Sequence, residues 1–265
     1  MLETVLALVL GLVIGSFLNV CIHRMPRDLS VVRPRSFCPA CEKKIAWYDN
    51  VPVVSYLALG GRCRHCRARI SPRYPIVEAL TGALFLVTVG ALGAGLAAVK
   101  WCLFHALMVG LIFSDLEERI LPDEFTLGGT AAGIALSAFV PMPFGYAQLL
   151  LAAFSSGRWL SVAESVLGAV AASGLLWMVG AAYKAVRRKE GLGLGDVKML
   201  ALAGSFMGFV GALQVLVLAS LVGSVTGLIY IRIRKKDHAT YELPLGTFLG
   251  AMAIVLALWQ SVRGG

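Results

Sequence analysis

The feature that most constrains this chain is a series of apolar segments that are each about as long as a membrane-spanning helix. Six of them approach the roughly 20 residues that cross a bilayer, and they lie near 2–22, 76–94, 96–114, 124–142, 161–183 and 243–262. With 58% hydrophobic and 15% charged residues and a mean hydropathy of +0.79, the chain is too apolar for an ordinary soluble domain. The pattern predicts an all-α polytopic membrane protein.

A further apolar run, 199–231, is too long for one ordinary span and slightly short for two. Basic residues flank it on both sides, so both of its ends are expected on the same side of the membrane, which requires an even number of crossings. We therefore expect a hairpin of two short helices that turns near Gly208 to Gln214, giving about eight spans. The first segment opens with Glu3 rather than with a basic region, which favours a retained span over a signal peptide.

The basic residues lie almost entirely on one side of this topology. The segments 23–75, 115–123, 184–198 and 232–242 hold all of the 24 Lys and Arg residues except Lys100, Arg158 and Arg263. By the positive-inside rule these segments face the cytosol and the N-terminus lies outside. Topology and contact with anionic lipid account for the formal charge of +9, so no nucleic-acid partner is expected.

The segment 23–75 is the only sizeable hydrophilic one, and it contains two Cys-x-x-Cys pairs: Cys38 with Cys41, and Cys63 with Cys66. The spacing is close to that of a four-thiolate tetrahedral zinc site. Two disulfides or a redox pair are the alternatives, but a cytosolic location disfavours stable disulfides. A module of about 50 residues also needs a staple in order to fold. Four cysteine ligands leave zinc no open position, so we expect a structural metal.

Two aspartates stand where apolar helices meet the cytosolic side. Asp115 follows the third span, and Pro122 and Asp123 mark a turn before the fourth, with Asp123 a plausible helix N-cap. For Asp115 the simple alternative is a solvated charge at a helix end.

Asp196 follows Gly193 and Gly195, which let the backbone bend and another chain approach closely. Its simple alternative is an N-cap for a helix that begins at Val197, with Lys198 nearby. If the two aspartates face each other in a low-dielectric site, they share a proton. Such a pair can activate water and polarise a peptide carbonyl, which is the chemistry of an aspartic protease. Protons of such a pair belong to the pair, so neither aspartate receives a fixed role.

Six blocks of the sequence resemble the type IV prepilin peptidases, the leader peptidase/N-methyltransferases of the GxGD membrane aspartyl protease group. They are GSFLNVCIHRMP at 15–26, CPAC at 38–41, GRCRHCRARISPRYPIVEALTG at 61–82, DLEERILPD at 115–123, GLGLGDVKML at 191–200 and ELPLGTFL at 242–249. The blocks follow the family's order and extend over nearly the whole chain. The chain departs from many members at Glu117, where they carry an aspartate, and this change keeps the charge.

The resemblance implies a first transmembrane helix at 1–22, a zinc-binding module at 23–75 and a membrane aspartyl protease domain at 76–265. It implies that Asp115 and Asp196 are the catalytic pair and that the four cysteines bind zinc. The implied enzyme sits in the bacterial cytoplasmic membrane, cuts the basic leader from type IV prepilins or type II secretion pseudopilins, and methylates the new N-terminus from S-adenosylmethionine. No Rossmann-type motif locates the methyl-donor site.

The cytosolic side is basic and should not attract a basic leader, so we expect the nearby acids Glu117, Glu118, Asp123 and Glu190 to supply the attraction. Two alternative functions remain open. One is a GxGD protease for other substrates, without methyl transfer. The other is a zinc-stapled membrane scaffold or transporter, although transporters usually place their acids near the bilayer midplane at the interface between repeats.

Overall fold

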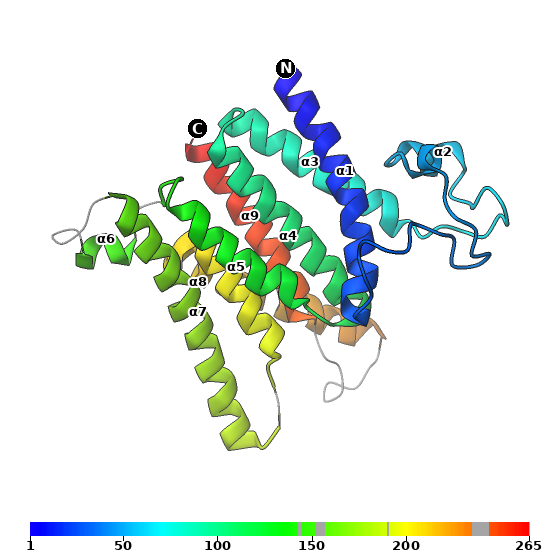
Figure 1. Cartoon of the computed structure of the whole chain (residues 1–265). Helices are drawn as coiled ribbons and strands as arrows, with labels where there is room; N and C mark the ends of the chain where they lie inside the picture. The colour runs from blue at the N-terminus through cyan, green and yellow to red at the C-terminus, as the bar shows by residue number, and fades with distance from the viewer. Residues whose placement is uncertain (143–144, 152–156, 190, 235–243, 265) are drawn as a thin grey trace.

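The protein is a bundle of helices in a computed structural model that describes residues 1–142, 145–151, 157–189, 191–234 and 244–264. The expected all-α fold is confirmed, because within these ranges the only β-structure is two isolated bridges. The helices, labelled in Figure 1, are α1 (Leu2–Arg24), η1 (Met25–Arg27), η2 (Trp47–Asn50), α2 (Val54–Ala58), α3 (Arg73–Leu92), α4 (Leu96–Glu118), α5 (Asp123–Ser137), α6 (Tyr146–Leu151), α7 (Gly157–Arg187), α8 (Leu194–Arg234) and α9 (Leu245–Gly264).

Five helical segments among the described residues are long and apolar enough to cross a membrane. They lie in α1, α3, α4, α7 and α8, and a shorter apolar segment, Leu245–Ser261, lies in α9. α5 has only 15 residues and ends at Ser137, short of the expected 142. α7 is longer than expected, with 31 residues, and its last turn carries Lys184 and Arg187, which favour a helix C-terminus. The chain is therefore a multi-pass membrane protein.

The apolar run that was expected to form a hairpin is broken at Gly208. Gly208 has φ +76° inside α8, a conformation that glycine adopts without a steric penalty. Val215 lines the same small cavity as Met199 and Ala203, whereas a straight helix would place Val215 about 18 Å from Ala203. The chain therefore turns back at Gly208, and in Figure 1 the orange second part of α8 returns toward the end of the bundle where the yellow first part starts. The run 199–231 therefore contains two helices joined at Gly208, as the hairpin prediction required.

The first part of α8 packs against α7 with backbone in contact with backbone. A Cβ placed on Gly204 would lie 2.2 Å from the carbonyl oxygen of Gly168, and one on Gly168 would lie 2.4 Å from the carbonyl oxygen of Gly204. Small residues of this kind let membrane helices approach closely. This contact fixes the position of α8 and of Asp196 at its start.

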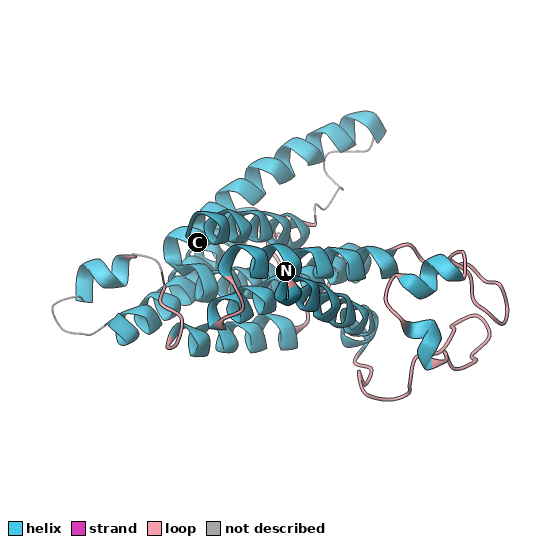
Figure 2. Cartoon of the chain, turned by 90° about the horizontal axis from the view of Figure 1, so that it is seen from above, coloured by secondary structure: helices cyan, strands magenta, loops and turns pink. Residues whose placement is uncertain are grey.

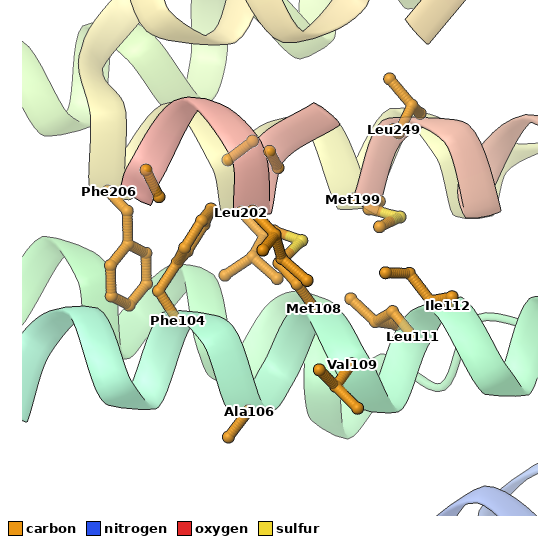
Figure 3. Close-up of a cluster of buried hydrophobic side chains, with 14 of the residues drawn as sticks. Phe104, Ala106, Met108, Val109, Leu111, Ile112, Met199, Leu202, Phe206 and Leu249 are labelled. Carbon is orange, nitrogen blue, oxygen red and sulfur yellow. The ribbon is translucent and has the colours of Figure 1, made fainter. Parts of the chain in front are cut away.

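The apolar core lies between α4, α8 and α9. Figure 3 shows Phe104, Met108 and Ile112 of α4 pointing toward side chains of α8 and α9, while Ala106 and Val109 point away from them. The rings of Phe104 and Phe206 are 5.0 Å apart, centroid to centroid, in a tilted arrangement. Such burial holds the three helices in a fixed arrangement. The ends of these helices carry the candidate site.

Residues 23–75, which we call the cysteine module, lie to one side of the bundle. Figure 1 shows α2 displaced laterally from α1 and away from α4 to α9, and Figure 2 shows a loop-rich part of the chain at the edge of the bundle. Arg24 anchors the start of the module, because its guanidinium donates hydrogen bonds to the carbonyl oxygens of Ser30 and Pro34 at 3.0 and 2.8 Å. The module is thus joined directly to the first and second membrane helices.

Candidate active site and cysteine cluster

Asp115 is held at the end of α4 by the first turn of α9. Its carboxyl group is buried, with 7% of the residue exposed. The backbone N–H and the hydroxyl group of Thr247 each donate a hydrogen bond of 2.7 Å to its Oδ2. Thr247 lies in the first helical turn, where backbone N–H groups have no partner within the helix. Asp115 is therefore not the solvated end charge that was considered as an alternative.

Both of these hydrogen bonds go to the same oxygen, and this fixes the rotation of the carboxyl group. Within the described residues, no other hydrogen bond to the Asp115 carboxyl group is seen. Oδ1 is therefore the oxygen that remains for a water molecule or a shared proton.

Asp196 lies in the first turn of α8, which begins at Leu194. The alternative, in which Asp196 caps a helix that begins at Val197, does not hold, because the helix starts three residues earlier, at Leu194. Its carboxyl group accepts a hydrogen bond from the backbone N–H of Gly193 and is close enough to Asp115 for the two charges to interact. A carboxylate at this position stabilises the free N–H groups of the helix start.

Leu121 lies between the starts of α8 and α9, next to both aspartates. A Cβ placed on Gly195 would lie 3.1 Å from Cδ1 of Leu121, and one on Gly246 would lie 3.2 Å from the same atom. A Cβ on Gly246 would also lie 3.1 Å from Cγ of Asp115. A side chain on either glycine would therefore force its neighbours to shift, and this packing brings the start of α8 close to Asp115. We call this end of the bundle the aspartate end.

Pro122, Asp123 and Lys198 connect α5 to α8 at the aspartate end. Pro122 occupies the N-cap position of α5 and Asp123 is its first helical residue, so the expectation that Asp123 is the N-cap is wrong by one residue. The Lys198 ammonium group donates to both carboxylate oxygens of Asp123, at 2.7 and 2.9 Å. This ion pair lies beside the aspartates and keeps Asp123 from acting as a third free acid.

The acids just after Asp115 are also paired. Glu117 forms an ion pair with Arg73 at the start of α3, and Glu118 forms one with Arg27 of η1. These pairs connect the end of α4 to η1 and to the start of α3, at the two ends of the cysteine module. Glu190, the remaining acid that was expected to attract a basic leader, lies outside the described residues.

The four cysteines of the module form one cluster. The sulfur atoms of Cys38, Cys41, Cys63 and Cys66 all lie within 4.8 Å of one another, and Sγ of Cys38 is 3.8 Å from Sγ of Cys66. All four are free thiols, so the alternative of two disulfides does not hold in this structure. Tetrahedral zinc with Zn–S bonds of about 2.3 Å separates its sulfur ligands by about 3.8 Å. The donor set therefore fits a closed four-thiolate metal site.

The two halves of the cluster repeat the same backbone structure. In the first half Cys38 N–H donates to Lys43 and Glu42 N–H donates to Cys38; in the second half Cys63 and Arg67 make the equivalent bonds to Ala68 and Cys63. The backbone N–H groups of Cys66 and His65 lower the pKa of the Cys63 thiol to about 6. These N–H groups therefore favour the thiolate form of Cys63, and the thiolate is the form that binds a metal.

Thr247 and Gly246 were not singled out from the sequence, although both lie in the block ELPLGTFL. A Gly-Thr pair at the start of a helix does not indicate which distant side chain the threonine will bind. Asp115 lies 132 residues away in the chain. Only the packing of α9 against α4 brings the groups together.

Fold and site together define a class: multi-pass helical membrane proteins with two aspartates at one end of the bundle and a four-cysteine cluster beside it. Comparison with protein families agrees with this class. Residues 9–92 match the bacterial peptidase A24 N-terminal domain, and residues 102–228 match the type IV leader peptidase family. The chain belongs to the type IV leader peptidase family, as the sequence resemblance indicated.

Three relatives show how far the similarity extends. The prepilin leader peptidase/N-methyltransferase of Aeromonas salmonicida (strain A449) is 34% identical over 96% of this chain and 90% of its own length. The protein of that name from Pseudomonas putida is 33% identical over the same shares. The one from Myxococcus xanthus (strain DK1622) is 40% identical over 92% of this chain and 69% of its own length. No solved structure matches the chain.

Proposed function

We propose that the protein is a membrane aspartyl endopeptidase that removes the basic leader from type IV prepilins or type II secretion pseudopilins and methylates the new N-terminus. The family and the names of its relatives support this proposal. The observation that supports it is the placement of Asp115 and Asp196 at one end of the bundle, close enough for their charges to interact, with Thr247 bound to one carboxyl group. Two neighbouring carboxyl groups in a low-dielectric site share a proton.

In this mechanism a water molecule lies between the two carboxyl groups. The ionised aspartate takes a proton from the water as the water oxygen bonds to the scissile carbonyl carbon. The protonated aspartate donates its proton to the carbonyl oxygen. When the C–N bond breaks, the departing amine nitrogen takes the proton that the water released, and one hydroxyl group of the intermediate returns its proton to the other aspartate, which restores the pair. We assign neither aspartate a fixed role, because the protons belong to the pair.

Oδ1 of Asp115 is the oxygen that acts in this scheme, because Thr247 occupies Oδ2. A carboxyl group that cannot rotate keeps this oxygen in the position that attack by water requires, and such positioning contributes to catalysis. Among the described residues, a Cβ on Gly193 would meet only Oδ2 of Asp196 and the backbone N of Gly195, at 3.4 and 4.0 Å, whereas the side-chain position of Gly195 is filled by Leu121. An extended peptide would therefore approach Asp196 at Gly193. Lys198 and Asp123 support the helix starts around the pair.

The four cysteines would hold zinc as a structural ion that folds the module and leaves no open position for catalysis. S-adenosylmethionine, when bound, supplies the methyl group that the new N-terminal amine accepts.

The proposed location is the bacterial inner membrane. The aspartate end and the cysteine module would face the cytosol, because the basic residues concentrate there. A prepilin presents a positive leader followed by an apolar helix, so its scissile bond would reach the membrane boundary. Membrane lipid is then a constant partner, and no nucleic acid is required.

The acidic side chains near the aspartate end are not free to bind a basic leader. Glu117, Glu118 and Asp123 were expected to attract the basic leader, but each already pairs with a basic side chain of the protein. Leader binding at these acids would have to break existing ion pairs. The positive leader is therefore more simply kept at the membrane boundary by its apolar helix than by these acids.

The proposal is tested by incubating the purified protein in lipid bilayers with a prepilin and labelled S-adenosylmethionine, and analysing the product by mass spectrometry. We expect a mature pilin that has lost its leader after a glycine and carries one methyl group on its N-terminus. Cleavage without methylation would favour the protease that lacks methyl transfer. An uncleaved prepilin, in a preparation that retains its metal and its fold, would favour the scaffold or transporter.

A further inference from the structure

The cysteine module exposes large apolar side chains over a short stretch, 45–58. Trp47 is 82% exposed, Val54 62% and Leu57 71%. Val54 and Leu57 lie three residues apart in α2 and so share a face of that helix, while Ser55 is buried and donates a hydrogen bond to the carbonyl oxygen of Tyr48. η2 and α2 therefore pack together by their polar contacts and leave apolar side chains outside. We call the residues Trp47, Val54 and Leu57 the apolar patch.

The apolar patch is fixed to a membrane helix. Val53, the residue before α2, has φ 60°, a conformation that is rare for a β-branched residue. Its backbone N–H donates a hydrogen bond of 2.7 Å to Oε2 of Glu78, which is buried near the start of α3. This contact holds the start of α2 against α3. The patch is thus placed at the side of the bundle rather than on a free tether, and Figure 1 shows α2 beside α1 and not beyond its end.

The module that carries the patch is strongly basic. Residues 23–75 contain eleven Lys and Arg residues but only three acidic ones, Asp28, Glu42 and Asp49. Asp49 is already bound by Arg64 through two hydrogen bonds of 2.8 and 2.6 Å. Such a surface attracts anionic lipid head groups, at about 1 kcal/mol for each basic residue near the membrane surface, and repels a basic leader peptide. Tryptophan beside basic side chains is typical of the membrane–water interface.

We propose that the apolar patch inserts into the head-group region of an anionic bilayer and holds the cysteine module against the membrane surface. Trp47, Val54 and Leu57 would reach the boundary between head groups and acyl chains, and the basic side chains around them would bind lipid phosphates. The module would then have a fixed orientation beside the helices that carry the aspartates. This inference does not depend on the catalytic roles of Asp115 and Asp196.

The test is the fluorescence of Trp47 in the full chain, reconstituted into bilayers that contain phosphatidylglycerol. The difference between wild type and Trp47→Phe isolates its signal from that of the other four tryptophans. We expect lipids brominated on their acyl chains to remove most of this signal, and aqueous acrylamide to have little effect. The protection from acrylamide should decrease in pure phosphatidylcholine. Introducing Leu57→Asp and Val54→Asp into both proteins should expose Trp47 to acrylamide in either bilayer.

The opposite quenching pattern would overturn the proposal: a Trp47 signal that acrylamide quenches and brominated lipid does not, in anionic bilayers. Protection that appears only when a prepilin is added would also overturn it, and would show that the patch binds substrate instead of lipid. Because no outcome is measured by peptide cleavage, failure of the proposed protease function would leave this test unaffected.

Discussion

Replacing Thr247 with valine removes one of the two hydrogen bonds to Oδ2 of Asp115 and keeps the shape of the side chain. The hydroxyl group donates at 2.7 Å, and the backbone N–H donates at the same distance and remains in the variant. A hydrogen bond to a charged group contributes about 1.5–3 kcal/mol. If that interaction is needed to hold Asp115 in the reactive position, cleavage should slow by about 10- to 150-fold, since about 1.4 kcal/mol corresponds to a factor of ten.

The assay is prepilin cleavage by the purified protein in bilayers, with kcat and KM determined separately. The loss should appear in kcat, because Thr247 contacts the aspartate and not the proposed substrate path. Thr247→Ser restores the hydroxyl group and should recover most of the rate. Thr226→Val is a matched control, since the Thr226 hydroxyl group is exposed and, within the described part of the chain, bonds to the backbone carbonyls of Val222 and Gly223 alone. Wild-type kcat in Thr247→Val, or no recovery in Thr247→Ser, would refute the argument.

Two further changes follow from the packing at the aspartate end and from the cysteine cluster. Gly246→Ala would place a methyl group 3.1 Å from Cγ of Asp115 and should lower the cleavage rate by shifting that carboxyl group. Gly128→Ala is the control, because its methyl group meets open space, and it should cleave at the wild-type rate. Equal cleavage rates in the two variants would show that packing at Gly246 does not position Asp115. Cys38→Ser should reduce the bound zinc measured by atomic emission and make the module sensitive to proteolysis, because three thiolates hold the ion less tightly. Cys102→Ser, outside the cluster, should keep a full zinc content, and a full content in both variants would contradict the assignment.

Much of the fold could be predicted because the bilayer imposes simple requirements on a helix. Apolar length identified the segments that became α1, α3, α4 and α7, and equal charge at both ends of 199–231 required the turn that the structure places at Gly208. The Cys-x-x-Cys spacing likewise identified a cluster that its local turns bring together. These features depend on residues that are near one another in the sequence, or on the membrane itself.

The details of the aspartate end could not be predicted, because they arise from contacts between distant segments. The bond from Thr247 to Asp115 spans 132 residues. The pairing of Glu117 with Arg73 spans 44 residues. The sequence does not reveal this pairing, so it predicted that Glu117 would be free to bind substrate. The first residue of α5 was misplaced by one position, since helix starts depend on local backbone geometry that composition does not determine.

The most direct test of the central claim is the cleavage rate of Asp115→Asn and Asp196→Asn, each measured separately on the same prepilin in the same bilayers. Asparagine keeps the shape of the side chain but cannot exchange the proton that the pair must share. Asp123→Asn is the matched control, because Asp123 lies at the same end of the bundle but pairs with Lys198. We expect each of the first two variants to lose cleavage almost completely and the control to keep most of it. Cleavage at the wild-type rate by either Asp115→Asn or Asp196→Asn would contradict the account.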